Sequence, residues 1–226
     1  MGRRTGPRRG CQDRPRMKVL FLHAWPEDER MWYPQLPVVR ELGLAAETPN
    51  LYGRGASIDG WASQLLGETY SPFVAVGASM GGYCALALAR RAPERVAGML
   101  LAGARTSADA IDRRRFREEV ISQLRTRGLP PELAESTVPP EHLADAQEAM
   151  RDRMDLSGIA SSFGGPLLVC VGDGDELVSV DEAREIADSA LVGTLEVFEG
   201  AGHFLTLDQP ERFNEVLKDF LSQWAT

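Results

Sequence analysis

The chain has 226 residues, of which 43% are hydrophobic and 26% are charged, values typical of one water-soluble globular domain. Acidic residues (33) outnumber basic ones (25), which gives a formal net charge of −8 at pH 7. Because this charge repels phosphate backbones, composition argues against nucleic acid as a partner. The sequence also lacks an apolar run long enough to span a bilayer, so we expect no membrane partner.

The first sixteen residues, MGRRTGPRRGCQDRPR, differ in composition from the rest of the chain. They contain six arginines and one aspartate, and they have no apolar core of the kind that a signal peptide requires. We expect this tail (residues 1–16) to be disordered and interpret it as a dispensable extension before Met17. An arm that binds nucleic acid or a membrane is the alternative interpretation.

The three cysteines, Cys11, Cys84 and Cys170, are widely separated. Their scatter indicates neither a disulfide framework nor a metal cluster. We therefore predict a cytoplasmic protein without a metal.

Short apolar runs predict strands that are buried on both faces of a parallel sheet. The strong candidates are residues 18–24, 73–79, 96–104 and 166–173, and the weaker ones are 44–49 and 194–200. Helical patterns lie between them near residues 31–42, 59–68, 80–91, 179–189 and 210–223. This alternation predicts an α/β fold with a doubly wound, mostly parallel sheet of about six strands.

Residues 106–163 interrupt the alternation. The segments 111–128 and 141–163 predict two amphipathic helices, separated by the proline-bearing stretch LPPELAESTVPP. We therefore divide the chain into the tail, an α/β core of residues 17–105 and 164–226, and a helical lid of residues 106–163. Because ligands bind at the carboxyl ends of parallel strands, such an insertion can cover the site. Its alternative role is a packing extension remote from any site.

Polar side chains follow three of the predicted strands. GASMG (residues 77–81) fits G-x-S-x-G between a strand and a helix, Asp173 and Asp175 follow the strand at 166–173, and His203 follows the last strand. A serine hydroxyl needs a base to take its proton, and that base needs an anion to orient it. This chain order supplies all three groups.

We therefore predict Ser79 as nucleophile, His203 as general base and Asp175 as the orienting carboxylate. The backbone N–H groups of Met80, at the start of a helix, and of Trp25, in the loop after the first strand, are the predicted oxyanion donors. The alternatives are a turn role for Ser79, a core role for His203, and Asp173 in place of Asp175. Of these two aspartates, Asp173 is expected to accept backbone N–H groups in its turn.

Several motifs together resemble those of the α/β-hydrolase family, in particular its small serine esterases, enol-lactonases and cofactor-free haloperoxidases. They are HAWP (23–26), NLYGRGAS (50–57), GASMGG (77–82), GDGD (172–175) and GAGHF (200–204). The resemblance covers the chain from Met17 onward except the centre of the insertion. It implies a hydrolase fold without the two N-terminal strands of larger members, and a reaction that needs no cofactor.

The resemblance also implies positions around the substrate. His23 corresponds to a loop histidine that orients the backbone rather than reacting, and His23, Trp25 and Phe204 are expected to border the substrate pocket. Tyr33 is a further pocket candidate, although core packing explains Trp25 and Tyr33 nearly as well.

These observations predict a serine hydrolase that cleaves a small-molecule ester or lactone through an acyl-enzyme on Ser79. The alternatives are a non-hydrolytic member of the fold (lyase, cyclase or ligand sensor), a thioesterase or carbon–carbon bond hydrolase, and an interaction module with a vestigial site. The sequence does not specify the substrate or the oligomeric state.

Overall fold

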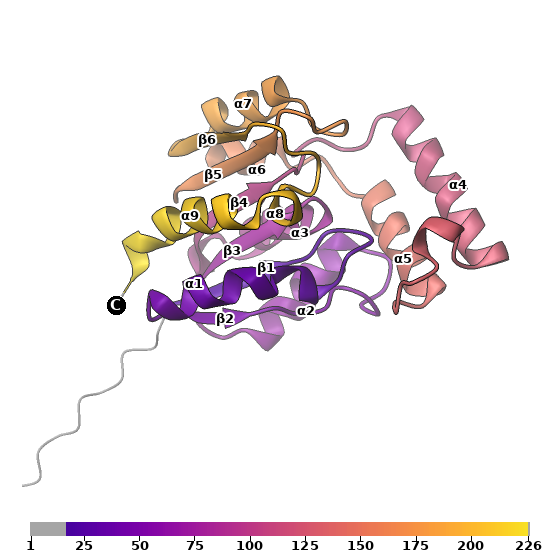
Figure 1. Cartoon of the computed structure of the whole chain (residues 1–226), viewed down its shortest axis with the longest axis horizontal. Helices are drawn as coiled ribbons and strands as arrows, with labels where there is room; N and C mark the ends of the chain where they lie inside the picture. Colours follow the sequence, from indigo (N-terminus) through magenta and orange to yellow (C-terminus); the bar gives the residue numbers. More distant parts are fainter. Residues whose placement is uncertain (1–16, 226) are drawn as a thin grey trace, which may run out of the picture.

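The structure is a computed structural model that describes residues 17–225. The tail of residues 1–16 lies outside the described residues, so the expectation of disorder there is not addressed. The described chain forms one open sheet of six strands, all parallel, in the order β2-β1-β3-β4-β5-β6 (Figure 1). The predicted doubly wound sheet of about six strands is confirmed.

The strands match the six apolar segments predicted from the sequence. They are β1 (Lys18–Leu22), β2 (Ala45–Glu47), β3 (Phe73–Ala78), β4 (Val96–Ala102), β5 (Leu167–Gly172) and β6 (Gly193–Phe198).

The α-helices lie between the strands and in the insertion. They are α1 (Leu36–Glu41), α2 (Ile58–Glu68), α3 (Met80–Arg91), α4 (Ile111–Arg127), α5 (Pro140–Arg151), α6 (Ser157–Ser162), α7 (Val180–Ser189), α8 (Leu205–Asp208) and α9 (Pro210–Leu221). The segment predicted as one helix at 31–42 is a 3₁₀ helix (Glu29–Gln35) followed by α1. Pro34 and Pro37 have no N–H to donate, which explains the change of helix type there.

Alternate residues of each strand supply the two faces of the sheet, as the pleat requires. In β1, Val19 and Phe21 belong to the apolar cluster beneath α1 and α9 on one face, whereas Leu20 and Leu22 belong to the cluster beneath α2 and α3 on the other. Figure 1 shows α1 and α9 in front of the sheet and α3 behind it. The sheet is therefore covered on both faces, and its carboxyl edge is left for a site.

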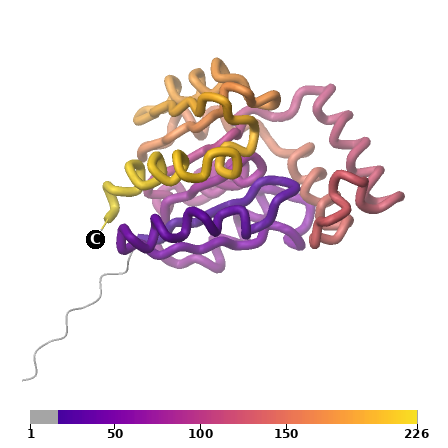
Figure 2. Tube along the Cα trace, viewed as in Figure 1, coloured from indigo at the N-terminus to yellow at the C-terminus, as the bar shows by residue number. Residues whose placement is uncertain are grey.

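The insertion between β4 and β5 contains α4, α5 and α6; in Figure 2, α4 and α5 stand on the side opposite the two ends of the described chain, whereas α6 lies beside α3 and α7. The single helix predicted at 141–163 is wrong, because the chain breaks between α5 and α6. At the break, Leu156 N–H donates to Thr106 O (2.8 Å) and the guanidinium of Arg153 donates to Ser107 O (2.8 Å). These contacts tie the break to the start of the insertion, and helical periodicity cannot reveal them.

No helix within residues 17–225 combines the length and the apolar character needed to cross a membrane.

Candidate active site

The site lies where the strand order reverses. From β1 the chain moves to one side of the sheet to form β2, and it then returns to the other side of β1 to form β3 and, beyond it, β4, β5 and β6. The loops after β1 and β3 consequently diverge and leave a crevice at the carboxyl edge, which is the usual ligand position in such sheets. Ser79 follows β3 directly at this point.

Ser79 occupies a sharp turn between β3 and α3. Its backbone has φ 47° and ψ −110°, and among residues 17–225 it is the one non-glycine residue with positive φ. Its N–H donates to Ala102 O of β4 (2.8 Å). A Cβ at Gly81 would collide with the carbonyl of Leu22, and one at Gly77 with the carbonyl of Gly81. The glycines of the G-x-S-x-G pattern therefore permit the close approach of β1, β3 and α3.

The structure brings the three predicted polar side chains together. His203 Nε2 lies 2.9 Å from Ser79 Oγ, and His203 Nδ1 lies 2.8 Å from Asp175 Oδ2. An ionised carboxylate can only accept, so Nδ1 carries the proton and Nε2 is free to accept the hydroxyl hydrogen of Ser79. This is the protonation pattern that a general base requires.

Asp175 is held by more than the histidine. Its side chain is completely buried, and its Oδ1 accepts the N–H groups of Leu177 (2.7 Å) and Val178 (3.0 Å). Burial alone would raise the pKa of Asp175, but the hydrogen bonds from His203 and the two amides outweigh it, so the pKa lies below its ordinary value. Asp175 is therefore kept ionised beside His203.

Asp173 does not reach the histidine. Its carboxylate instead accepts Gly200 N–H (2.7 Å) in the turn after β6. The structure also places Gly103, with φ +58°, against the Asp175–His203 pair, where a Cβ would lie 3.2 Å from His203 Nδ1. Gly103 was not among the predicted site residues, because its only signal in the sequence is a glycine directly after a buried strand.

The two expected oxyanion donors have no partner within the described part of the chain. Neither the N–H of Met80 nor that of Trp25 donates to another group among residues 17–225, although Met80 is fully buried. Buried backbone N–H groups without an acceptor are rare in folded proteins. Met80 N–H stands at the N-terminus of α3, where partial positive charge favours an anion.

His23 is fully buried behind the loop after β1 and does not line the cavity beside Ser79. Its Nε2 accepts Leu51 N–H (2.9 Å), so its Nδ1 carries the proton and donates to Ala24 O (2.9 Å). Burial lowers the pKa of His23, which keeps the ring neutral. The side chain thus ties two loops together through these two hydrogen bonds.

A cavity of about 510 Å³ opens beside Ser79 and His203. Trp25 and Phe204 line it, whereas the Tyr33 side chain is exposed elsewhere. The Trp25 indole N–H also donates to Leu143 O of α5 (3.2 Å), so the loop after β1 is bonded to the insertion. This volume is within the usual range for small-molecule sites.

The insertion supplies one wall of this cavity, which the sequence analysis did not anticipate in detail. The lining residues from α4 and α5 are Arg113, Phe116, Arg117, Gln147 and Met150. The only signal for them was the spacing of arginines along α4, a pattern that is equally typical of a solvated helix face.

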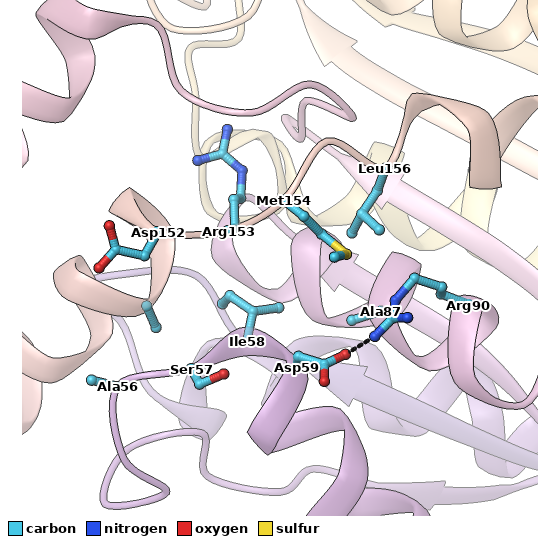
Figure 3. A pocket seen from close by; sticks show the side chains of 11 residues that line it. Ala56, Ser57, Ile58, Asp59, Ala87, Arg90, Asp152, Arg153, Met154 and Leu156 are labelled. Atoms are coloured by element: carbon cyan, nitrogen blue, oxygen red, sulfur yellow. Dashed lines mark hydrogen bonds and ion pairs between the residues drawn. The ribbon is translucent and has the colours of Figure 1, made fainter.

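A second, smaller cavity of about 140 Å³ lies between α2, α3 and the break after α5 (Figure 3). Asp59 and Arg90 form an ion pair in it, and the guanidinium of Arg153 points away from Asp59 (Figure 3). It contains no serine–histidine pair. Within residues 17–225, no group of three or more histidine, cysteine, aspartate or glutamate side chains is arranged to hold a metal ion.

The sequence matches the model of the "Alpha/beta hydrolase family" over residues 19–216. A curated relative, the pimeloyl-[acyl-carrier protein] methyl ester esterase of Aromatoleum aromaticum, is 36% identical over 94 residues. That match covers 39% of this chain and 37% of the esterase. Lipase LipV of Mycobacterium tuberculosis is 32% identical over 118 residues, which are 47% of this chain and 43% of the lipase. The matched segments thus span less than half the length of these curated relatives.

Similarity to solved structures extends over nearly the whole chain. A thermophilic esterase from Thermogutta terrifontis, solved with malate bound, has a TM-score of 0.85 and 26% identity, covering 93% of this chain and 91% of the esterase. The enol-lactonase of Burkholderia xenovorans has a TM-score of 0.78 and 19% identity over 94% of both chains. The second likeness concerns the fold alone.

Proposed function

Because the chain belongs to the alpha/beta hydrolase family, we propose that it is a serine hydrolase that cleaves small carboxylic esters or lactones. The observation that carries this proposal is the continuous hydrogen-bond chain from Ser79 through His203 to Asp175. It opens on a cavity of small-molecule size. The two relatives named as esterases support an ester as the substrate.

In the first half-reaction, Ser79 Oγ attacks the ester carbonyl carbon while His203 Nε2 takes the hydroxyl proton. Asp175 accepts a hydrogen bond from His203 Nδ1–H and stabilises the imidazolium that forms. The negative charge on the carbonyl oxygen is stabilised by the N–H groups of Met80 and Trp25, which have no acceptor in the described part of the free protein.

Collapse of this intermediate breaks the bond to the alcohol oxygen, which receives the proton from His203 Nε2. The products at this stage are the free alcohol and an acyl group on Ser79. Water then attacks the acyl carbon with His203 again as base, and the proton returns to Ser79 Oγ as the carboxylic acid leaves. The insertion, residues 106–163, acts as the lid that shapes the cavity over these steps.

The proposal is tested with p-nitrophenyl butyrate and a fluorophosphonate probe. The wild-type protein should hydrolyse the ester and gain one phosphonyl adduct on Ser79 by intact mass, whereas Ser79→Ala should lose turnover by about 10⁴-fold or more and take no adduct. Equal turnover by the two proteins would contradict the proposal. An unlabelled wild-type protein without turnover would favour a non-hydrolytic member of the fold.

A further inference from the structure

The wall of the cavity formed by α4 carries two guanidinium groups. Arg113 and Arg117 are separated by four residues, so they lie on the same face of the helix, and both line the cavity that contains Ser79. Two like charges at this spacing destabilise a helix. Burial and the charge of Arg117 lower the pKa of Arg113, but a guanidinium remains charged at neutral pH.

The protein neutralises only one of these two cations. Arg117 donates to the carboxylate of Asp109 and to Gln147 Oε1 (2.7 Å). Arg153 lies on the other oxygen of the same carboxylate, at 2.7 Å. Asp109 therefore pairs with two guanidinium groups, and it forms no hydrogen bond or ion pair with Arg113, although its charge acts on Arg113 from a distance.

Arg113 has no hydrogen bond or ion pair from its guanidinium within residues 17–225. Its neighbours in the same arginine run are different, because Arg114 pairs with Asp152 and the exposed Arg115 lies 3.8 Å from Asp112. Helix stability does not explain the position either, since a cation in the first turn opposes the helix dipole. The half-buried, unpaired cation faces the cavity instead.

The other charges at the cavity do not replace this missing partner. Asp175 is hydrogen-bonded to His203, and Glu176, which follows it, is exposed to solvent. Arg105 lies 3.2 Å from Glu182. Of the two cations on the α4 wall, Arg117 is therefore paired with a carboxylate and Arg113 is not.

We propose that Arg113 binds a carboxylate carried by the substrate, so that the protein selects esters with a free carboxylate at a second position, such as half-esters of dicarboxylic acids. This inference rests on the proposed function. A planar guanidinium matches a carboxylate with two parallel hydrogen bonds, and a partly desolvated site strengthens them. The carboxylate would balance the charge that Asp109 leaves uncompensated.

The test compares charged and neutral substrates of equal shape. Monomethyl esters of succinic, glutaric and adipic acid place the carboxylate on the acyl side, and butyryloxyacetate places it on the alcohol side. Each is paired with the primary amide of the same shape. In either the acyl-side or the alcohol-side series, we expect kcat/KM to be about ten- to a hundredfold higher for the carboxylate than for the amide. This ratio corresponds to the free energy of a hydrogen bond to a charged group.

Arg113→Gln should lower kcat/KM for the carboxylate substrate more than for the matched amide, so that their ratio falls toward one, and Arg113→Lys should restore part of the ratio. Arg115→Gln is the matched control on the exposed side of α4 and should keep the full preference. Equal kcat/KM for acid and amide in every series, or an equal loss for both in Arg113→Gln, would overturn the inference.

A binding measurement separates this inference from the proposed function. In the Ser79→Ala background, glutarate but not glutaramide should raise the thermal unfolding midpoint, and Arg113→Gln should abolish that shift. Hydrolysis of the neutral ester without any preference for carboxylates contradicts the inference alone. If glutarate binds in an Arg113-dependent way but Ser79 is not labelled and no ester is turned over, the proposed function alone is contradicted.

Discussion

The sheet edge and the insertion position their functional side chains by different means. At the sheet edge, Ser79, Asp175 and His203 each follow a parallel strand. The end of that strand fixes the position of the side chain. In the insertion, a buried polar cluster does this work. Among the residues of the described chain that are less than a tenth exposed, the aspartates and arginines are Asp109 (8%), Arg117 (6%) and Arg153 (6%). Backbone topology therefore positions the serine, histidine and aspartate, whereas side-chain charges position the α4 wall of the cavity.

The largest effect should come from the carboxylate at the sheet edge. In Asp175→Asn, the side-chain amide would donate to His203 Nδ1 and leave Nε2 protonated, so Ser79 would have no base. We expect kcat on p-nitrophenyl butyrate to fall about 10⁴-fold. Asp173→Asn is the matched control and should leave kcat nearly unchanged, because Asp173 contacts Gly200 rather than His203. Similar losses in both variants would remove the distinction between these two aspartates.

An intermediate effect is expected in the insertion, on stability rather than on chemistry. Asp109 has a fully buried side chain, and Asp109→Asn would leave Arg117 and Arg153 without a counter-charge. Removing one partner of a buried ion pair costs about 3–5 kcal/mol, to be measured by urea unfolding at pH 7. If the free energy of unfolding stays unchanged, the buried cluster does not hold the insertion in place.

The same cluster predicts a pH dependence. Burial alone would raise the pKa of Asp109, but hydrogen bonds and charge from Arg117 and Arg153 outweigh it and lower the pKa. Asp109 therefore contributes stability that is fully present above the ordinary aspartate range, about pH 4, and that is lost as pH falls through the lowered pKa. The wild-type protein should lose stability in this acid range more steeply than Asp109→Asn, as measured by thermal unfolding.

The smallest effect should come from the exposed ion pairs of the insertion. Arg125 bridges Asp145 (3.0 Å) and Glu148 between α4 and α5, with 45% of its side chain exposed. Arg125→Gln should lower the free energy of unfolding by about 1 kcal/mol or less, because solvent screens such pairs. A loss comparable to that in Asp109→Asn would show that surface charges, not the buried cluster, stabilise the insertion.

The two regions also differ in how far the sequence predicted them. Short apolar strands place the residues that follow them at one edge, so the juxtaposition of Ser79, Asp175 and His203 followed from chain order. The choice of Asp175 over Asp173 is consistent with the observed hydrogen bond. No such rule applies to α4, where four arginines lie within five residues, at 113–115 and 117. Which of them faces the cavity without a partner depends on where Asp109 and Asp152 lie in three dimensions, and periodicity carries no such information.

The backbone of Ser79 has a consequence for the evolution of the chain. A left-handed conformation at a residue with a Cβ costs about 1–3 kcal/mol, and glycine would occupy the same turn without that cost. Selection for stability alone would therefore favour glycine at position 79, whereas the proposed turnover requires the hydroxyl of Ser79. The strained turn at Ser79 lowers the free energy of unfolding, and this loss is the stability cost of the proposed activity. Packing on both faces of the sheet must offset it.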